Sequence, residues 1–178
     1  MIPGGRSGRR AAICWPVVRI GIVSDTHNHL ANCERIVGIF NAAGVERVVH
    51  TGDITQAKTL RVLAGLRAPL CGVWGNNDLE RASLEAAAAE LGQRFEDPPL
   101  RARWGGRQIV VVHDPLDLDA ALLAGADVAL YGHDHRRAIE RRGAVLCVNP
   151  GECAGHLVGH NAVGILDLRT LRVEIERF

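Results

Sequence analysis

Short apolar runs that end in polar residues set the pattern of the first third of the chain. The run from Ile20 to Val23 is apolar or small throughout and includes β-branched residues, which is typical of a strand buried on both faces. It leads directly into Asp25 and His27. Because functional side chains in open α/β sheets lie just beyond the carboxyl ends of the strands, the pattern predicts a pair of ligands at a strand end.

The following segments alternate between helical and extended periodicity. Apolar residues recur at helical spacing from Leu30 to Ala43, and Gly44 provides a stop signal. We expect further strands over 46–50 and 69–74 and further helices over 55–66 and 82–91. This βαβαβ order predicts a mainly parallel sheet covered by helices.

Beyond residue 91 the pattern changes to short strands joined mostly by tight turns, with one short helix expected over 116–123. The expected strands cover residues 93–104 with an interruption at 97–99, 108–112, 128–131, 138–141, 144–148, 162–168 and 171–177. So many strands do not easily join one open sheet. We therefore expect an α/β fold in which two β-sheets pack face to face and helices flank them.

Length and composition limit the class of protein. A chain of 178 residues with 47% hydrophobic and 23% charged residues is typical of one globular domain. No stretch approaches the roughly 20 apolar residues of a membrane span, which predicts a soluble protein. We expect residues 1–15 to be a disordered, Arg- and Gly-rich leader and residues 16–178 to form a single domain.

Charge and cysteine usage narrow the partners and the compartment. The net charge is +1, and we find no basic stripe or aromatic platform of the kind that nucleic-acid binding uses. The five cysteines contain no CxxC pair, which argues against a disulfide framework and a cysteine zinc site. These features favour a cytoplasmic protein and leave its oligomeric state open, a homo-oligomer included.

Seven side chains at or just after predicted strand ends could bind metal ions. They are Asp25, His27, Asp53, Asn76, His113, His133 and His135. Each alone has a structural explanation, such as a turn, a helix cap or a core histidine. Five strand ends that emerge in one direction and all carry such residues favour a metal site.

The donor types indicate which ions and which chemistry. Imidazole, carboxylate and amide donors without thiolate suit Mn²⁺ as well as Fe²⁺, Ni²⁺, Co²⁺ and Zn²⁺. Seven ligands are too many for one such ion, whereas an aspartate can bridge two ions about 3.5–4 Å apart. Such a pair holds a phosphoryl group and lowers the pKa of a shared water, which becomes a hydroxide nucleophile.

The ordered motifs resemble the calcineurin-like metallophosphoesterases over the chain from Val18 to the C-terminus. The motifs are Asp25-Thr26-His27, Gly52-Asp53, Gly75-Asn76-Asn77-Asp78, His113 and Gly132-His133-Asp134-His135. The small size and the segment Asn149-Pro150-Gly151-Glu152-Cys153 are similar to the compact phosphodiesterases of archaea and bacteria. The resemblance implies a four-layer α/β/β/α sandwich with two mixed β-sheets, in agreement with the pattern of elements.

The resemblance also implies how the ligands divide between two ions. It assigns the first ion to Asp25, His27 and His135. It assigns the second to Asn76, His113 and His133, with Asp53 bridging, and it implies that Asp53, Asn76 and His133 contribute to catalysis through the metals. In this ligand set Mn²⁺ is our first choice.

Three further residues are expected around the ligands. Asp78 is expected to orient a ligand or a histidine. Asn77 occupies the position where many phosphomonoesterases of the superfamily have a histidine, and an amide cannot act as a general acid. His156, in the Gly-rich loop 151–159, could approach the substrate or replace the missing acid. A second departure from the family pattern is Asp114, which adds a negative charge beside the second ion.

These observations predict an enzyme, a metal-dependent phosphodiesterase that acts on a small phosphodiester substrate. A phosphomonoesterase or nucleotidase would share the metals and differ in the acid. The other alternative is a non-catalytic, metal-binding interaction scaffold with the same fold, since fold alone does not make an enzyme.

Overall fold

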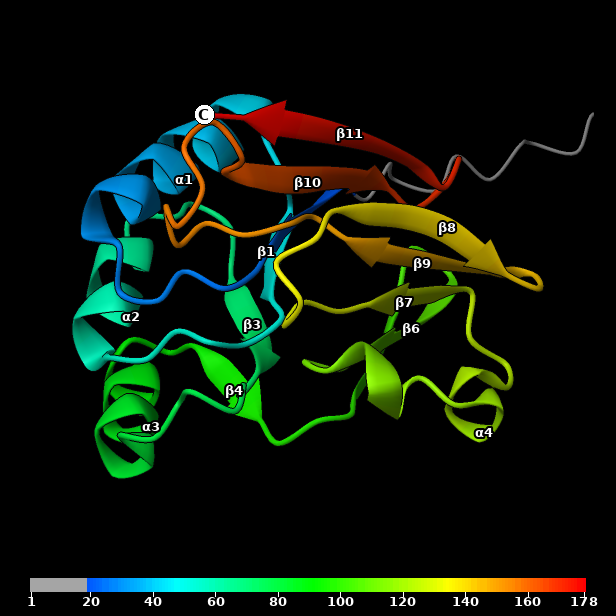
Figure 1. Ribbon diagram of the computed structural model, residues 1–178, viewed down its shortest axis with the longest axis horizontal. Helices are drawn as coiled ribbons and strands as arrows, with labels where there is room; N and C mark the ends of the chain where they lie inside the picture. Colours follow the sequence, from blue (N-terminus) through cyan, green and yellow to red (C-terminus); the bar gives the residue numbers. More distant parts are fainter. Residues whose placement is uncertain (1–18) are drawn as a thin grey trace, which may run out of the picture.

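The computed structural model describes residues 19–178 as two β-sheets packed between layers of helix (Figure 1). The six-stranded sheet has the order β11-β10-β1-β2-β3-β4, and the five-stranded sheet has the order β5-β6-β7-β9-β8. Both sheets are mixed, since each contains parallel and antiparallel neighbours. The expected leader, residues 1–15, lies outside the described residues.

The strands of the first sheet are β1 (Arg19–Val23), β2 (Arg47–His50), β3 (Leu70–Val73), β4 (Arg94–Glu96), β10 (Ala162–Asp167) and β11 (Arg172–Arg177). Those of the second are β5 (Leu100–Trp104), β6 (Arg107–Val111), β7 (Val128–Leu130), β8 (Ala138–Arg142) and β9 (Val145–Asn149). Each expected strand is present within a few residues of its predicted limits. The expected strand 93–104 is divided at 97–99 between the two sheets, as the two prolines there require.

Apolar side chains on both faces of each sheet produce the layers. Ile22 on β1 and Val111 on β6 belong to the core between the sheets. Cys33 and Phe40 of α1 (Leu30–Ala43) pack on the opposite face of the first sheet. The helices α2 (Ala57–Leu63) and α3 (Arg81–Glu90) continue this outer layer. The expected α/β/β/α architecture is confirmed.

The fourth layer is thinner than predicted. Instead of one helix over 116–123 there is a 3₁₀ turn, Pro115–Asp117, and a single-turn helix, α4 (Ala120–Leu123). Asp114 and Asp119 each accept a hydrogen bond from a backbone N–H two or three residues later and so begin two separate turns. The expectation of one continuous helix was wrong because these two caps divide it.

The topology brings the carboxyl ends of five strands to one edge of the molecule. β1, β2 and β3 run parallel in the first sheet, and β6 and β7 run parallel in the second. The loops that follow these strands therefore meet where the two sheets lie against each other. Among residues 19–178, no helix is long and apolar enough to cross a membrane.

Candidate metal centre

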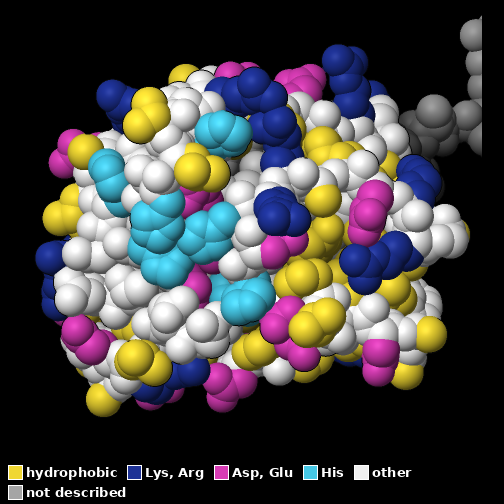
Figure 2. All heavy atoms as spheres, in the orientation of Figure 1, with side chains coloured by type: hydrophobic (Ala, Val, Ile, Leu, Met, Phe, Trp, Pro, Cys, Tyr) yellow, Lys and Arg dark blue, Asp and Glu magenta, His cyan; other side chains and the backbone are white. Residues whose placement is uncertain are grey.

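Histidine side chains gather in one patch on the face seen in Figure 2, with acidic side chains between them. The patch contains the loops that follow β1, β2, β3, β6 and β7, and all seven predicted ligands lie in these loops. The structure thus brings the seven side chains together, although they are spread over more than a hundred residues of sequence.

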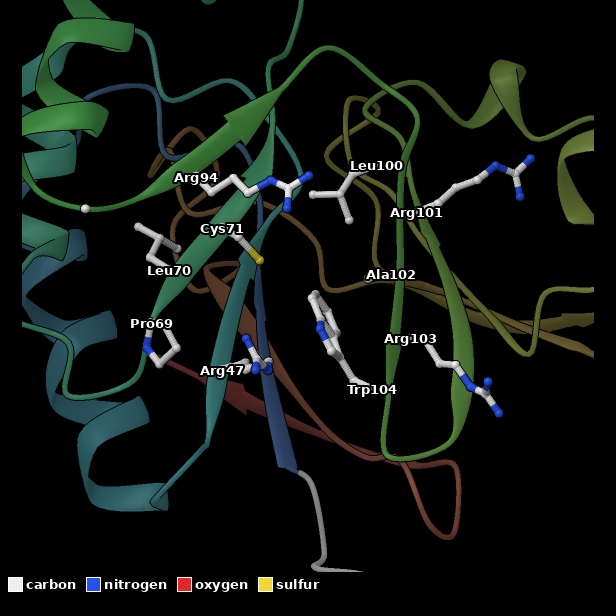
Figure 3. A pocket seen from close by; sticks show the side chains of 11 residues that line it. Arg47, Pro69, Leu70, Cys71, Arg94, Leu100, Arg101, Ala102, Arg103 and Trp104 are labelled. Atoms are coloured by element: carbon white, nitrogen blue, oxygen red, sulfur yellow. The ribbon is translucent and has the colours of Figure 1, made fainter.

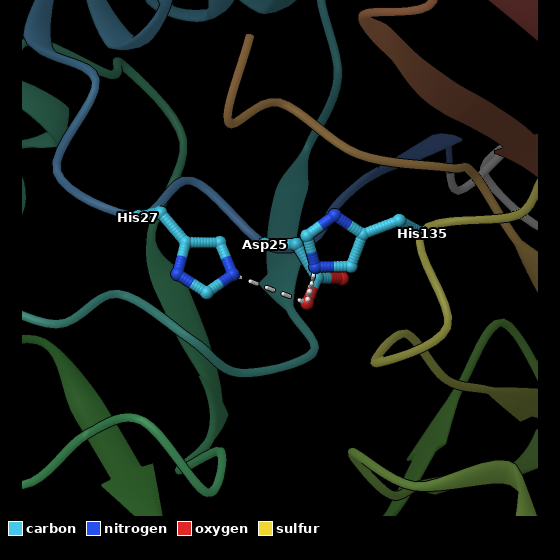
Figure 4. Close-up of side chains that lie close together, drawn as sticks. All are labelled: Asp25, His27 and His135. Atoms are coloured by element: carbon cyan, nitrogen blue, oxygen red, sulfur yellow. Dashed lines mark ion pairs between the residues drawn. The ribbon is translucent and has the colours of Figure 1, made fainter. Parts of the chain in front are cut away.

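Asp25, His27 and His135 form one half of the cluster (Figure 4). The Oδ1 atom of Asp25 lies 3.8 Å from Nε2 of His27 and 3.4 Å from Nε2 of His135. Asp25 Oδ1 and His27 Nε2 are buried and have no hydrogen-bond partner within residues 19–178. Two ligand atoms about 2.1 Å from one ion are about 3.0 Å apart at a right angle and up to about 4.2 Å apart when they lie opposite each other, so both distances and the unpaired atoms fit a divalent cation.

Asn76, His113 and His133 form the other half. Asn76 Oδ1 lies 2.9 Å from His113 Nε2 and 2.9 Å from His133 Nδ1, and the two ring nitrogens are 3.2 Å apart. The Nδ1 atom of His113 lies 2.9 Å from the carbonyl oxygen of Thr51. That hydrogen bond leaves Nε2 of His113 as the atom directed into the cluster.

Asp53 lies between the halves. Its Oδ2 is 3.4 Å from Nε2 of His27, and its Oδ1 is 3.4 Å from Nε2 of His113. Asn77 donates to both oxygens, from its backbone N–H at 2.9 Å and from its amide at 2.8 Å. Asn77 therefore fixes the orientation of the carboxylate that faces both halves.

The electrostatics around Asp53 favour an ionised carboxylate. Burial alone would raise the pKa of Asp53, but the contacts with His113 and Asn77 outweigh burial and hold it well below its usual range. Burial lowers the pKa of His113, and the contact with Asp53 reverses this and raises it. By contrast, burial raises the pKa of Asp25 and lowers that of His27.

The ligand loops adopt backbone conformations that cost energy. Positive φ angles between 39° and 72° occur at Asp25, His27, Asp53, His133 and His135. Each such non-glycine residue costs of order 1–3 kcal/mol, and such strain concentrates at functional sites. The surrounding hydrogen bonds maintain it: the four backbone N–H groups of Asp53, Ile54, Thr55 and Gly75 donate to the carboxylate of Asp78.

Asp78 was expected to orient a ligand or a histidine. Its carboxylate accepts hydrogen bonds from the backbone of the Asp53 loop and from Gly75, and it makes no hydrogen bond to a histidine side chain among residues 19–178. Glycines make the close approach of these loops feasible. A Cβ atom on Gly132 would lie 2.7 Å from Oδ2 of Asp25, and one on Gly75 would lie 2.9 Å from Cγ of Asp53.

The family of this protein follows from a match to a family model and from a similar protein. The calcineurin-like phosphoesterase superfamily domain matches residues 18–171. A phosphodiesterase of Methanocaldococcus jannaschii is 36% identical over 154 residues, which cover 84% of this chain and 93% of that protein. The chain belongs to the calcineurin-like phosphoesterase superfamily.

Solved structures agree with the membership in this superfamily. An archaeal phosphodiesterase superposes with a TM-score of 0.84 and 33% identity, and the match covers 90% of this chain and all of that one. Vps29 of Chaetomium thermophilum superposes with a TM-score of 0.67 and 16% identity, over 90% of this chain and 95% of that one. At 16% identity the second likeness concerns the fold alone.

Two residues of this calcineurin-like site were not singled out by sequence reasoning. Glu152 is buried, and its Oε2 lies 2.9 Å from Nδ1 of His135, which turns Nε2 of that ring toward Asp25. Buried His50 joins two ligand loops: its Nδ1 accepts a hydrogen bond from Gly52 N–H, and its Nε2 contacts the Thr26 hydroxyl. The expectation that functional side chains follow the carboxyl ends of strands does not predict these contacts.

His156 extends the same half of the cluster. Its ring stacks on that of His135 with centroids 5.3 Å apart, and its Nδ1 lies 3.5 Å from Oε2 of Glu152. The side chain of His156 is 59% exposed. It therefore lies between the buried ligands and the solvent, where a substrate would enter.

A separate cavity of about 340 Å³ lies away from these residues (Figure 3). Its lining includes Arg47, Pro69 and Leu70, at the amino-terminal ends of β2 and β3, whereas the ligands follow the carboxyl ends. Trp104 points into it, and Arg101 and Arg103 point away. This cavity is not part of the candidate metal centre.

Proposed function

We propose that this protein is a metal-dependent phosphodiesterase that binds two divalent ions per chain around Asp53. The observation that carries the proposal is that each oxygen of Asp53 faces an imidazole nitrogen of a different half of the cluster, at 3.4 Å in both cases. A carboxylate in this position can be shared by two ions. Membership of the superfamily supports a phosphoester substrate, and the phosphodiesterase of M. jannaschii supports a diester.

Three residues, Asp25, His27 and His135, would hold one ion. Asn76, His113 and His133 would hold the other, and Asp53 would be shared. Two such ions, when bound, polarise the phosphate oxygens and lower the pKa of water so that hydroxide is available near neutral pH.

The protein residues position these donors. Glu152 holds the ring of His135, the carbonyl of Thr51 holds that of His113, and Asn77 holds both oxygens of Asp53. Side chains fixed in this way need not reorganise when the charge on the phosphate changes during the reaction.

The absence of an acid at Asn77 favours diesters over monoesters with poor leaving groups. The amide of Asn77 cannot donate a proton as a general acid, and the backbone N–H and the side-chain NH2 of Asn77 each donate a hydrogen bond to Asp53. Exposed His156 lies beside the ligands and could meet the substrate. We therefore assign it a substrate contact in this proposal.

We also propose Mn²⁺ as the physiological ion and the cytoplasm as the compartment. Carboxylate and amide oxygens together with imidazoles and no thiolate suit Mn²⁺, and Ni²⁺, Fe²⁺, Co²⁺ and Zn²⁺ are the ions to compare with it. The four cysteines within residues 19–178 are free, which suits a reducing compartment.

The test is metal content together with hydrolysis of bis-p-nitrophenyl phosphate and p-nitrophenyl phosphate, with each ion added in turn to metal-free protein. We expect close to two ions per chain and faster turnover of the diester. Faster turnover of the monoester would favour a phosphomonoesterase. Bound metal without turnover of either ester would favour a scaffold, and no bound metal would refute the proposal.

A further inference from the structure

Large hydrophobic side chains with high exposure are concentrated around the candidate metal centre. Within residues 19–178 the large hydrophobic residues with exposed side chains are Leu79, Leu116, Ile139, Leu157 and Val158. All but Ile139 lie in segments that follow the strands at the ligand-bearing edge, three of them in loops and Leu116 in a 3₁₀ turn, and these four, which we name the hydrophobic rim, are 55% to 97% exposed. Hydrophobic side chains also border the histidine patch in Figure 2.

A carboxylate connects each of the three rim loops to the cluster. Leu79 directly follows Asp78, which accepts a hydrogen bond from the backbone N–H of Asp53. The N–H of Leu116 donates to Oδ1 of Asp114 at 2.8 Å, and Oδ2 of Asp114 lies 3.7 Å from Nε2 of His133.

The third loop repeats this arrangement. The N–H of Leu157 donates to Oε1 of Glu152 at 2.9 Å, and Oε2 of Glu152 contacts His135. The backbone of the rim segments is therefore held beside the ligands, and the rim side chains are exposed to solvent at this edge.

Fold stability does not account for the rim. Single exposed hydrophobic residues are common on protein surfaces, but four of the five within residues 19–178 lie in segments beside the ligands, and exposed apolar patches of this kind mark binding surfaces. These side chains bury little area, so they contribute little to the core. Contact with a ligand would remove apolar surface from water and would favour binding.

The charges beside the cluster restrict the ligand further. Asp114 lies next to His133 and is about one-third exposed, so it repels additional negative charge on a substrate. A phosphodiester carries a single negative charge, whereas a nucleotide or nucleic-acid strand carries several. On the side of His133, the site therefore combines apolar residues with a carboxylate that disfavours additional negative charge.

We propose that the hydrophobic rim makes this site selective for phosphodiesters whose organic substituents are apolar. The proposal rests on the proposed phosphodiesterase function and specifies its substrate class. Each apolar group that leaves water on binding increases kcat/KM, because the rim contacts the substituent and leaves the phosphate chemistry unchanged.

The experiment uses metal-loaded full-length protein and p-nitrophenyl phosphodiesters whose second substituent is methyl, butyl or octyl. The alkyl groups differ in apolar area and hardly in intrinsic reactivity. We expect kcat/KM to rise by about tenfold or more from methyl to octyl. In the double variant Leu116→Ser, Leu157→Ser we expect the rise to fall below about threefold, with the methyl diester hydrolysed at a nearly unchanged rate.

The matched control is Ile139→Ser, since this exposed residue lies on β8 and has no carboxylate connection to the cluster. It should keep the full dependence on chain length. Hydrolysis of all three diesters at equal kcat/KM would overturn the rim proposal and leave the phosphodiesterase function intact.

Two other outcomes would also overturn it. An undiminished dependence on chain length in the double variant would mean that other residues contact the substituent. A wild-type dimer that dissociates in the double variant, with no dependence on chain length, would mean that the rim is an interface between two copies. No hydrolysis of any diester would refute the proposed function as well.

Discussion

The two halves of the candidate metal centre use similar residue types but satisfy their polar atoms differently. In the half with Asp25 and His27, two buried ligand atoms have no hydrogen-bond partner in the described part of the chain, and the side chain of Asp25 is fully buried. In the half with Asn76 and His113, the donor atoms lie within hydrogen-bond distance of one another, and the side chain of His133 is 39% exposed.

Because of this difference, we expect the two halves to bind metal ions with different affinities. An unpartnered buried polar atom costs free energy until an ion pairs with it, so binding to the first half removes a penalty. Binding to the second half must first break existing contacts and displace water. We therefore expect the Asp25 half to bind the tighter ion. Four predictions test this comparison, in order of decreasing effect.

Asp53 belongs to both halves, so its loss should affect them together. Asp53→Asn should lower kcat/KM for a diester by about 10³-fold or more, because the shared carboxylate charge is removed. Elemental analysis should find fewer ions per chain. Asp97→Asn, at a residue whose side chain is 82% exposed and pairs with Arg81, is the matched control and should change neither quantity. Undiminished turnover in Asp53→Asn would remove the basis of the proposed function.

Substitutions in each half should separate the two binding events. Titration of metal-free protein with Mn²⁺ should resolve a tight and a weak event that differ by about tenfold or more in Kd, a free-energy difference of about 1.4 kcal/mol. His27→Ala should abolish the tight event, and His133→Ala should leave it in place. Two events of equal affinity, or the reverse assignment, would contradict the asymmetry.

Substitution of the carboxylates that contact the ligand histidines should change the two metal affinities in the same unequal way, but less than loss of a ligand does. Glu152→Gln should weaken the tight event by about 10–100-fold, because His135 loses the carboxylate that orients its ring. Asp114→Asn should weaken only the weak binding event, and by a smaller factor than Glu152→Gln weakens the tight one, since Asp114 lies 3.7 Å from His133 and is partly exposed. Calorimetric titration of both variants measures this, and equal effects would show that the halves are not held independently.

His50 is not a predicted ligand, and its ring joins the loop after β1 to the loop after β2. It should therefore affect the stability of the metal-free protein. Burial lowers the pKa of His50 to about 3, whereas an unfolded histidine titrates near 6.5. Below pH 6.5 the unfolded state therefore binds a proton that folded His50 does not. Stability should fall as the pH decreases from 6.5 toward 3, by up to about 1.4 kcal/mol per pH unit from this group.

The control for this effect is His50→Asn, which keeps an acceptor for the N–H of Gly52. Denaturant unfolding at pH 7.5 and 5.5 should give a smaller loss of stability at the lower pH for His50→Asn than for wild type. An identical loss in the two proteins would mean that His50 is protonated in the folded state.

Much of the fold was predictable because its signals are local. The limits of α1 agree with the predicted ones to the residue, since apolar spacing and a left-handed glycine stop are both sequence signals. The expectation of one helix over 116–123 failed because Asp114 and Asp119 both cap turns, and periodicity does not show which caps will form.

The residues at the ends of the strands can be identified from the amino-acid sequence alone, and the parallel arrangement of β1, β2 and β3 places them at one edge. The hydrogen-bond partners of these ligands are known from the folded structure alone. Glu152 is 17 residues from His135, and Asn77 is 24 residues from Asp53, yet each pair makes a direct hydrogen bond. Such contacts depend on how two sheets pack and how loops bend, because a side chain's partners are fixed by distances in space and not by its spacing along the chain.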